Sequence, residues 1–292
     1  MIEYPNLLAA ALGLLGESVH LLDGQEVDYV IVGGWSPYFL NNGRLEHPGS
    51  RDVDILFREA EEPMRLREVV RQFLANGFFL SAKHSFQVLK TLNVCGELFV
   101  FNVDLLHPRE SKVDPDLFID HLELPIPLRE YMDDRFFVKS IAIPQSRFIF
   151  DGHCVQYGYP FTLPSGVRLD IEFSLMTEVG LIVTKSGSVN NEKRPRDAFD
   201  IFLAVEQARD YSALVDAFKR LKIKDRPVYN TLYGIRNSLE KREFGKRVIR
   251  YLSAGALPGH IGAPTETQEE LVVNRMEVFL RDVELEPKAL PD

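Results

Sequence analysis

Two aspartates in the first fifth of the chain have the residue type and spacing of metal ligands. Asp52 and Asp54 stand two residues apart, within an apolar frame that continues to Phe57. Side chains at i and i+2 of a strand project from the same face, so the two carboxylates would lie side by side. Such a pair of oxygen ligands can share a divalent cation. Carboxylates among core residues cost free energy unless they are paired or metal-bound, so the pattern predicts a metal-binding strand.

A glycine pair lies a short distance before this strand. The apolar run from Val27 to Val32 ends in Gly33 and Gly34, and Ser36 follows. Glycine allows positive φ and lets backbone amides approach phosphate oxygens, while Ser36 adds a hydroxyl donor. Alone, a Gly-Gly pair is usually a plain turn and Asp-x-Asp a solvated strand edge. Their order, with a short helix expected at residues 37–41 between them, favours a phosphate-binding turn followed by a metal-binding strand.

These motifs resemble a known superfamily. The Gly-Gly-x-Ser turn followed by Ser-Arg-Asp-Val-Asp at residues 50–54 is similar to the signature of nucleotidyltransferases of the polymerase-β type. The resemblance implies an α/β (α+β) fold, a polymerase-β-like core with a mixed sheet flanked by helices. It also implies nucleotide-binding roles for five residues: Gly33, Gly34, Ser36, Ser50 and Arg51.

The superfamily carries a third carboxylate on a neighbouring strand, and Asp104 is the candidate here. It interrupts the run from Leu98 to Leu106, whose β-branched and aromatic content predicts a strand. The resemblance implies that Asp52, Asp54 and Asp104 hold two Mg²⁺ ions, roughly 3.5 to 4 Å apart, with Asp104 on the acceptor side. Asp104 is also the candidate base for the acceptor proton.

Nucleotidyl transfer is the reaction that this resemblance implies. An acceptor oxygen attacks the α-phosphorus of a nucleoside triphosphate such as ATP, and pyrophosphate leaves. The enzyme must therefore mainly stabilise anionic oxygens, and Lys185 would offset charge on the phosphates.

A second resemblance covers residues 185–201. Lys185 and the later segment Lys-Arg-Pro-Arg-Asp-Ala-Phe-Asp-Ile, residues 193–201, are similar to the downstream motifs of AbiEii-type (type IV) toxin nucleotidyltransferases, although Arg196 replaces the usual lysine. The resemblance implies catalytic roles for Lys185 and Asp197, tRNA or another RNA as acceptor, and an antitoxin protein as partner. From the residues alone, Asp197 equally suits the first turn of a helix that begins at Pro195, and for Asp200 this stabilising role is favoured over a functional one. Lys185 equally suits a solvated helix or strand end.

Other functions stay open beside this one. The Gly-Gly-Trp turn is also similar to nucleotidyltransferases that modify aminoglycoside and lincosamide antibiotics, which favours a small-molecule acceptor. A catalytically idle member of the fold would bind a nucleotide or a partner protein. A metal nuclease centred on Asp170 and Glu172 is a third alternative, but this alternating pair is better explained as the polar face of a strand.

Composition bounds the class of protein. The chain has 292 residues, of which 45% are hydrophobic and 26% charged, enough for a sizeable core. Two cysteines argue against a disulfide framework or a zinc cluster. The first residues lack the basic region of a signal peptide, and the apolar run from Leu7 to Leu15 is far shorter than the ~18 residues of a membrane span. We expect a cytoplasmic protein with no membrane association.

The pattern along the chain predicts a nucleotidyltransferase core at residues 1–207 and a helical region at 208–292. Within the core we expect helices at 6–22 and 62–75, strands at 78–80 and 86–89, and two hairpins separated by turns at 157–160 and 164–166. Prolines break the periodicity between residues 107 and 144, which predicts a loop with short elements.

The C-terminal region also differs in charge. Residues 209–250 contain twelve Lys/Arg and five Asp/Glu, in a chain whose net charge is −9. Tyr229 and Tyr233 stand among them. A basic segment beside an acidic core favours a nucleic-acid acceptor, and the alternative is a solvated helical face.

Overall fold

The computed structural model describes residues 2–25, 27–41, 46–58, 63–109, 116–123, 135–144, 146–224, 226–256 and 266–285. The chain divides into two compact units, Met1–Trp35 with Ser50–Leu175 and Ser36–Gly49 with Met176–Asp292. The α/β class, the mixed sheet and the helical C-terminal region are confirmed. The change of unit at Leu175 falls earlier than the domain boundary expected between residues 207 and 208.

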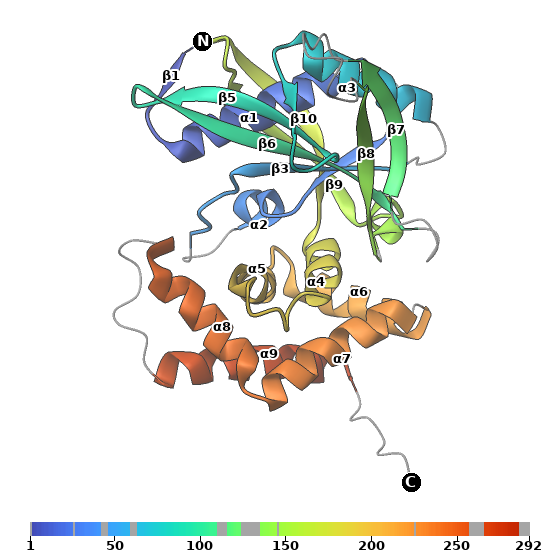
Figure 1. The fold of residues 1–292 in the computed structure, drawn as a ribbon. Helices are drawn as coiled ribbons and strands as arrows, with labels where there is room; N and C mark the ends of the chain where they lie inside the picture. The colour runs from blue at the N-terminus through green and yellow to red at the C-terminus, as the bar shows by residue number, and fades with distance from the viewer. Residues whose placement is uncertain are drawn as a thin grey trace. The chain divides into compact units, whose positions relative to one another are not determined.

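The first unit is built on one mixed sheet (Figure 1). Its main path runs β1-β5-β6-β3-β2-β10-β9, while β4 pairs with β5, and β8 pairs with β6 and β7. The strands are β1 (Glu3–Tyr4), β2 (Tyr29–Val32), β3 (Asp52–Phe57), β4 (Phe79–Leu80), β5 (Gln87–Val94), β6 (Glu97–Pro108), β7 (Asp116–Glu123), β8 (Arg135–Ile143), β9 (Cys154–Thr162) and β10 (Arg168–Met176), with a short 3₁₀ turn at Arg147–Phe150.

Helices α1 (Leu7–Leu22) and α3 (Pro63–Ala75) pack in this unit (Figure 1). Asn6 caps α1, because its side chain accepts a hydrogen bond from the amide of Ala9. Helix α1 contacts β3, β5, β6 and β9. The buried residues of β3 and β6 alternate with half-buried polar ones, as a sheet covered on one face requires.

Two expectations about this unit were wrong. Residues 107–144, expected to be mostly loop, contain the long antiparallel pair β7 and β8. The prolines do not interrupt these strands, because Pro108 is the last residue of β6 and Pro144 follows the end of β8. Residues 157–160, expected to form a turn, lie inside β9, so only the turn at 164–166 separates β9 from β10.

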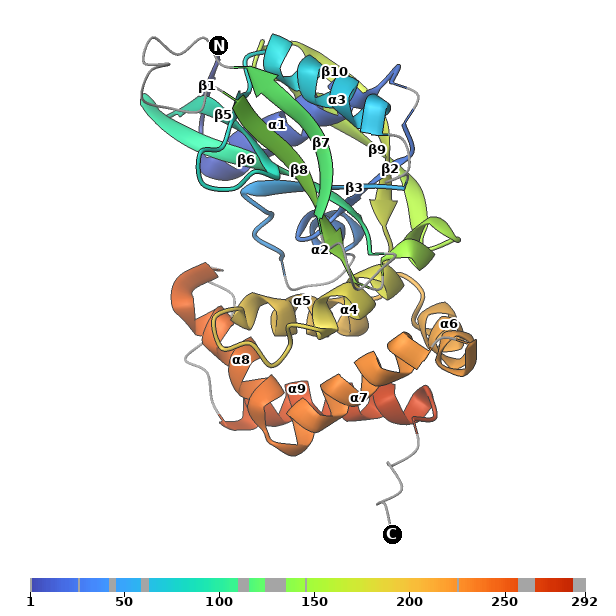
Figure 2. The ribbon, with the colours of Figure 1, turned by 45° about the vertical axis from the view of Figure 1, so that its right-hand side comes forward.

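The second unit is helical. It contains α2 (Trp35–Leu40) from Ser36 onward, and then α4 (Glu178–Ser186), α5 (Pro195–Glu206), α6 (Tyr211–Lys224), α7 (Arg226–Glu240), α8 (Glu243–Tyr251), a π-helical turn at Leu252–Ala256, and α9 (Glu266–Asp282). Helix α5 is its centre, since every residue from Asp197 to Val205 is buried. It lies beside α4 (Figure 2) and also contacts α8 and α9. Pro195 is the first residue of α5, as expected.

The apolar stripe on α9 is buried against this unit's core, with Met276 and Phe279 fully inaccessible. Within the described residues, no helix has the length and apolar character needed to cross a bilayer.

Candidate active site

The register of two strands brings the predicted carboxylates onto one face of the sheet. Strands β3 and β6 are parallel, with Asp54 opposite Asp104 and Asp52 opposite Asn102. All four side chains are half-buried, whereas the residues between them, such as Val53 and Val103, are fully buried on the opposite face. The three predicted metal ligands therefore share one face with a fourth polar residue, Asn102, between two adjacent strands.

Gly33 fits against one of these carboxylates. Its φ is +72°, in the left-handed region that favours glycine. A Cβ at this position would lie 1.9 Å from Oδ2 of Asp54, so no larger residue could occupy the turn without displacing that carboxylate. Gly34 is buried next to it. The Gly-Gly pair thus has a geometric relation to the acidic strand, which a plain turn would not need.

Two amides hold the third carboxylate. Asn102 and Gln87 each donate to Oδ1 of Asp104, at 2.7 and 3.0 Å. Oδ2 of Asp104 has no hydrogen-bond partner among the described residues. Burial raises the pKa of Asp104 to about 6, the Asn102 hydrogen bond opposes this rise, and the negative charge of Asp52 adds to it. The negative charge of Asp52 is therefore close enough to disfavour the ionised form of Asp104.

The start of β3 is tied to the glycine turn. The indole Nε1 of Trp35, a fully buried residue, donates to the carbonyl oxygen of Asp52 at 2.8 Å. The Ser50 hydroxyl donates to the Asp52 carboxylate, and Ser50 itself is buried. Arg51, between them, is exposed. Ser50 thus positions a carboxylate, while a contact of Ser50 or Arg51 with a nucleotide stays a prediction.

The donor set suits a hard cation, but it is not assembled as a finished metal cage. Carboxylate and amide oxygens on one sheet face are the ligands that Mg²⁺ prefers. However, no group of three or more His, Cys, Asp or Glu in the described part of the chain converges closely enough to hold a metal. In this arrangement Asp54 lies against Gly33 and Asp104 is turned toward its two amides. Binding of a cation by all three carboxylates would require side-chain rotation.

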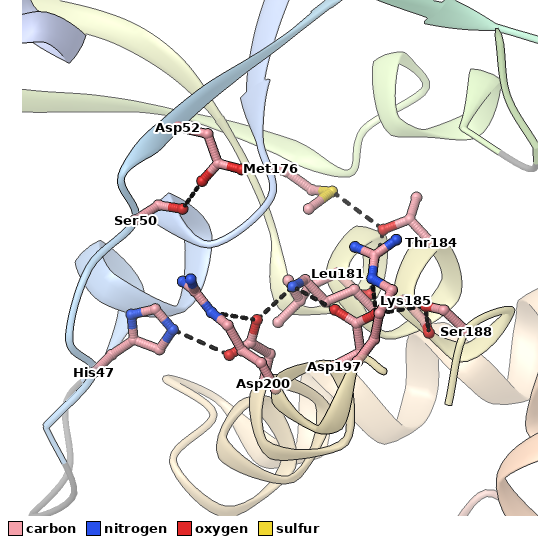
Figure 3. A network of polar contacts seen from close by, with 12 residues as sticks. His47, Ser50, Asp52, Met176, Leu181, Thr184, Lys185, Ser188, Asp197 and Asp200 are labelled. Atoms are coloured by element: carbon pink, nitrogen blue, oxygen red, sulfur yellow. Dashed lines mark hydrogen bonds and ion pairs between the residues drawn. The ribbon is translucent and has the colours of Figure 1, made fainter. Parts of the chain in front are cut away.

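Lys185 and Asp197 belong to the second unit, where they form a buried ion-pair cluster (Figure 3). Nζ of Lys185 lies between two carboxylates of α5, 3.1 Å from Oδ1 of Asp197 and in a shorter contact with Asp200. The Ser188 hydroxyl donates to Asp197 at 2.6 Å, and Arg194 pairs with the same carboxylate at 2.9 Å. Both aspartates are almost completely buried.

The charges of this cluster stabilise one another. Burial alone would raise the pKa of Asp200, but Lys185 and His47 outweigh it and lower that pKa well below its ordinary value. Burial opposes the charge of Lys185, yet Asp200 and Asp197 raise its pKa. The ammonium is therefore already neutralised inside the chain, and its predicted contact with a triphosphate stays a prediction.

His47 closes the cluster as a neutral donor. Its Nδ1 accepts from the amide of Gly49 at 3.1 Å, which assigns the proton to Nε2, and Nε2 lies 3.0 Å from Oδ1 of Asp200. Burial lowers the pKa of His47, although Asp200 favours its charged form. Arg196 donates to the carbonyl oxygen of Gly49 at 2.6 Å, so the segment of residues 46–49 is fixed to α5 at two points.

Other predicted residues lie elsewhere. Ser36 is fully buried in the second unit, where it lines a small pocket with Leu181 and Leu203, and its hydroxyl has no hydrogen-bond partner within the described ranges. Its contact with a phosphate stays a prediction. Asp170 and Glu172 are exposed along β10, which agrees with the polar face of a strand.

Four residues have positioning roles that the sequence pattern does not predict: Gln87, Asn102, His47 and Asp200. Asn102 could have been found, because Asn-Val-Asp in β6 repeats the alternation of Asp-Val-Asp in β3. Gln87 becomes visible only through the β5–β6 register, where it is opposite Asp104. Asp200 was interpreted as a helix-dipole acid, and its cationic partner was not foreseen.

Comparisons with known proteins add no relative to this picture, since no protein-family model and no curated protein matches the chain.

Proposed function

We propose that this protein is a Mg²⁺-dependent nucleotidyltransferase, which transfers a nucleoside monophosphate from a nucleoside triphosphate to an acceptor hydroxyl and releases pyrophosphate. One observation supports this most strongly: Asp54 and Asp104 are register partners on adjacent parallel strands, with Asp52 on the same face and Gly33 packed against Asp54. An Asp-x-Asp pair that occurred by chance would not be expected to have both an acidic register partner and a glycine packed against it.

The residues have distinct roles in this proposal. Asp52, Asp54 and Asp104 would hold Mg²⁺, which would supply positive charge to the phosphate oxygens and the leaving pyrophosphate. The amides of Gln87 and Asn102 fix one oxygen of Asp104 and leave Oδ2 available. Oδ2 is then the oxygen that would receive the acceptor proton.

The acceptor that we favour is RNA, in line with the basic charge of residues 209–250. An AbiEii-type toxin enzyme with a cognate antitoxin is the corresponding finer proposal. A small antibiotic-like acceptor would use the same carboxylates.

The test is incubation of the purified protein with each α-³²P-labelled nucleoside triphosphate, Mg²⁺, total RNA and cell extract. We expect label on an acceptor, and no label with the Asp52→Ala/Asp54→Ala variant. A catalytically idle protein would bind triphosphate without labelling anything. The incomplete convergence of the carboxylates makes this the alternative to exclude.

A further inference from the structure

The basic segment at residues 209–250 does not present its charge evenly. Several of its cations are used within the chain: Arg209 pairs with Glu178, Lys219 pairs with Glu284, and Lys222 donates to the carbonyl oxygens of Val283 and Glu284. Arg236 donates to the carbonyl oxygen of Leu285. These residues hold the helices of the second unit together, so their charge is partly consumed.

Helix α8 and the residue before it retain their charge. Arg242, Lys246 and Arg250 are exposed and have no ion-pair partner among the described residues. Lys246 and Arg250 stand at i and i+4 on one side of α8, and Arg242 is its N-cap residue; we call these three residues the α8 ridge. Lys246 and Arg250 are about 6 Å apart along the axis, from a rise of 1.5 Å per residue. This spacing is similar to that of successive phosphates on a nucleic-acid strand.

The orientation of the ridge is fixed by packing. Phe244 and Val248 are fully buried on the opposite side of α8. Gly245 lies so close to α9 that a Cβ there would be 2.7 Å from Cγ of Glu269. The helix cannot rotate its basic edge inward without losing these contacts, so the ridge is preorganised, which lowers the entropy cost of binding.

Arg247 adds positive charge beside the ridge. It is 8% exposed and donates through one nitrogen to the carbonyl oxygen of Asn190 at 3.0 Å and to Glu243 at 3.3 Å. Its Nε and Nη1 have no hydrogen-bond partner in the described part of the chain. Residues 242–250 thus carry four cations and one carboxylate.

We propose that the α8 ridge binds the phosphate backbone of the acceptor RNA. That the bound RNA is the acceptor rests on the proposed function, but RNA binding itself needs neither nucleotide nor metal. Exposed Lys and Arg in a regular row contact phosphates without reading sequence, so the ridge would supply affinity and position rather than base specificity.

The test measures binding of a fluorescein-labelled RNA hairpin with a single-stranded 3′ end, by fluorescence anisotropy in EDTA over a salt series. The variant Lys246→Gln/Arg250→Gln removes two ridge charges. The control Arg220→Gln/Lys224→Gln removes two exposed cations at the same i, i+4 spacing on α6. We expect binding about tenfold weaker for the ridge variant, with a salt slope shallower by about 1.4, and a much smaller change for the control.

Three results of the binding measurement would overturn the proposal: no binding of the hairpin by the unaltered protein, equal weakening by both variants, or displacement of the hairpin by poly-glutamate as effectively as by unlabelled RNA. The last would assign the ridge to an acidic protein. If the ridge variant labels RNA as well as the unaltered protein does, the ridge does not bind the acceptor, and the proposed transferase activity still stands. Ridge-dependent binding with no labelling of any acceptor would refute the transferase instead.

Discussion

The two acidic groups of this molecule are held by different kinds of partner. The hydrogen-bond donors to Asp52 and Asp104 are a hydroxyl and two amides, all neutral. Asp197 and Asp200 share the ammonium of Lys185 and are almost completely buried. A carboxylate neutralised within the chain needs no ligand, whereas carboxylates held by neutral donors keep their charge for a cation. The same residue type is therefore expected to serve chemistry in the sheet and stability in the helices.

The contrast between the two acidic groups would be contradicted most clearly if a sheet carboxylate could be removed without loss of activity. We expect Asp54→Asn to reduce nucleotidyl transfer on the order of 10³-fold, since charge stabilisation in such sites is a large term. Its free energy of unfolding should stay near that of the unaltered protein, because the side chain is half-buried beside another acid. Label transfer and urea unfolding, measured on the same preparation, check both statements. Retained activity would place the chemistry elsewhere.

The helical group should respond in the opposite way. Lys185→Met leaves two buried carboxylates without their shared cation, and breaking such a pair costs about 3–5 kcal/mol. We expect this loss in urea unfolding, against almost none for Lys193→Met, whose side chain is exposed. A Lys185→Met protein that is fully stable but inactive would contradict a structural role and favour the phosphate contact predicted from sequence.

The sequence indicated the sheet group better than the helical group for a physical reason. Asp52, Asp54 and Asp104 are acids in apolar strands, and period-2 alternation alone predicts that Asp52 and Asp54 share a face. Strand pairing was needed to show that Asp54 is opposite Asp104. In the helical group, His47 and Asp200 are 153 residues apart, and no local pattern connects them. An acid near a helix start has a sufficient local explanation, which concealed the buried ion pair.

The wrong expectation of a loop at residues 107–144 has the same cause, a long-range contact that a local pattern does not show. The spacing of the prolines predicts a loop, although a proline at a strand end removes no central ladder hydrogen bond. Strand β7 pairs with β8, and β8 pairs in turn with β6, a contact that a local pattern does not contain.

Protonation of Asp104 provides a further test of the contrast between the two acidic groups. Its folded-state pKa of about 6 is above its ordinary value of 3.8, so the folded protein binds this proton more tightly. The resulting stabilisation is complete below pH 3.8 and is lost as the pH rises through about 6, with a total of at most about 3 kcal/mol. In EDTA, the stability difference between Asp104→Asn and the unaltered protein should therefore grow from pH 4.5 to pH 7. A stability difference that does not change with pH would contradict the raised pKa of Asp104.

Gly33 gives a test of position rather than charge. Gly33→Ala imposes a left-handed alanine and a contact with Asp54, and we expect transfer to fall on the order of 10²-fold. Gly24→Ala is the matched control, because Gly24 has a φ of +80° but nothing within 4 Å of a Cβ. Both variants should lose about 1 kcal/mol of stability from backbone strain. Equal activity in the two variants would show that Gly33 does not position Asp54 for the reaction.

His47 should give the smallest effect, with a pH slope opposite in sign to that of Asp104. Its folded-state pKa is lowered by burial, so the unfolded chain binds the proton more readily. The stability that depends on neutral His47 is present above its ordinary pKa of 6.5 and is lost as the pH falls, by at most about 1.4 kcal/mol per pH unit. His47→Gln keeps a donor for Asp200 and an acceptor for the Gly49 amide, but it cannot titrate. We therefore expect the unaltered protein, but not His47→Gln, to lose this stability between pH 7 and pH 5.5 in urea unfolding. Parallel pH profiles would mean that His47 is charged in the folded state as it is in the unfolded chain.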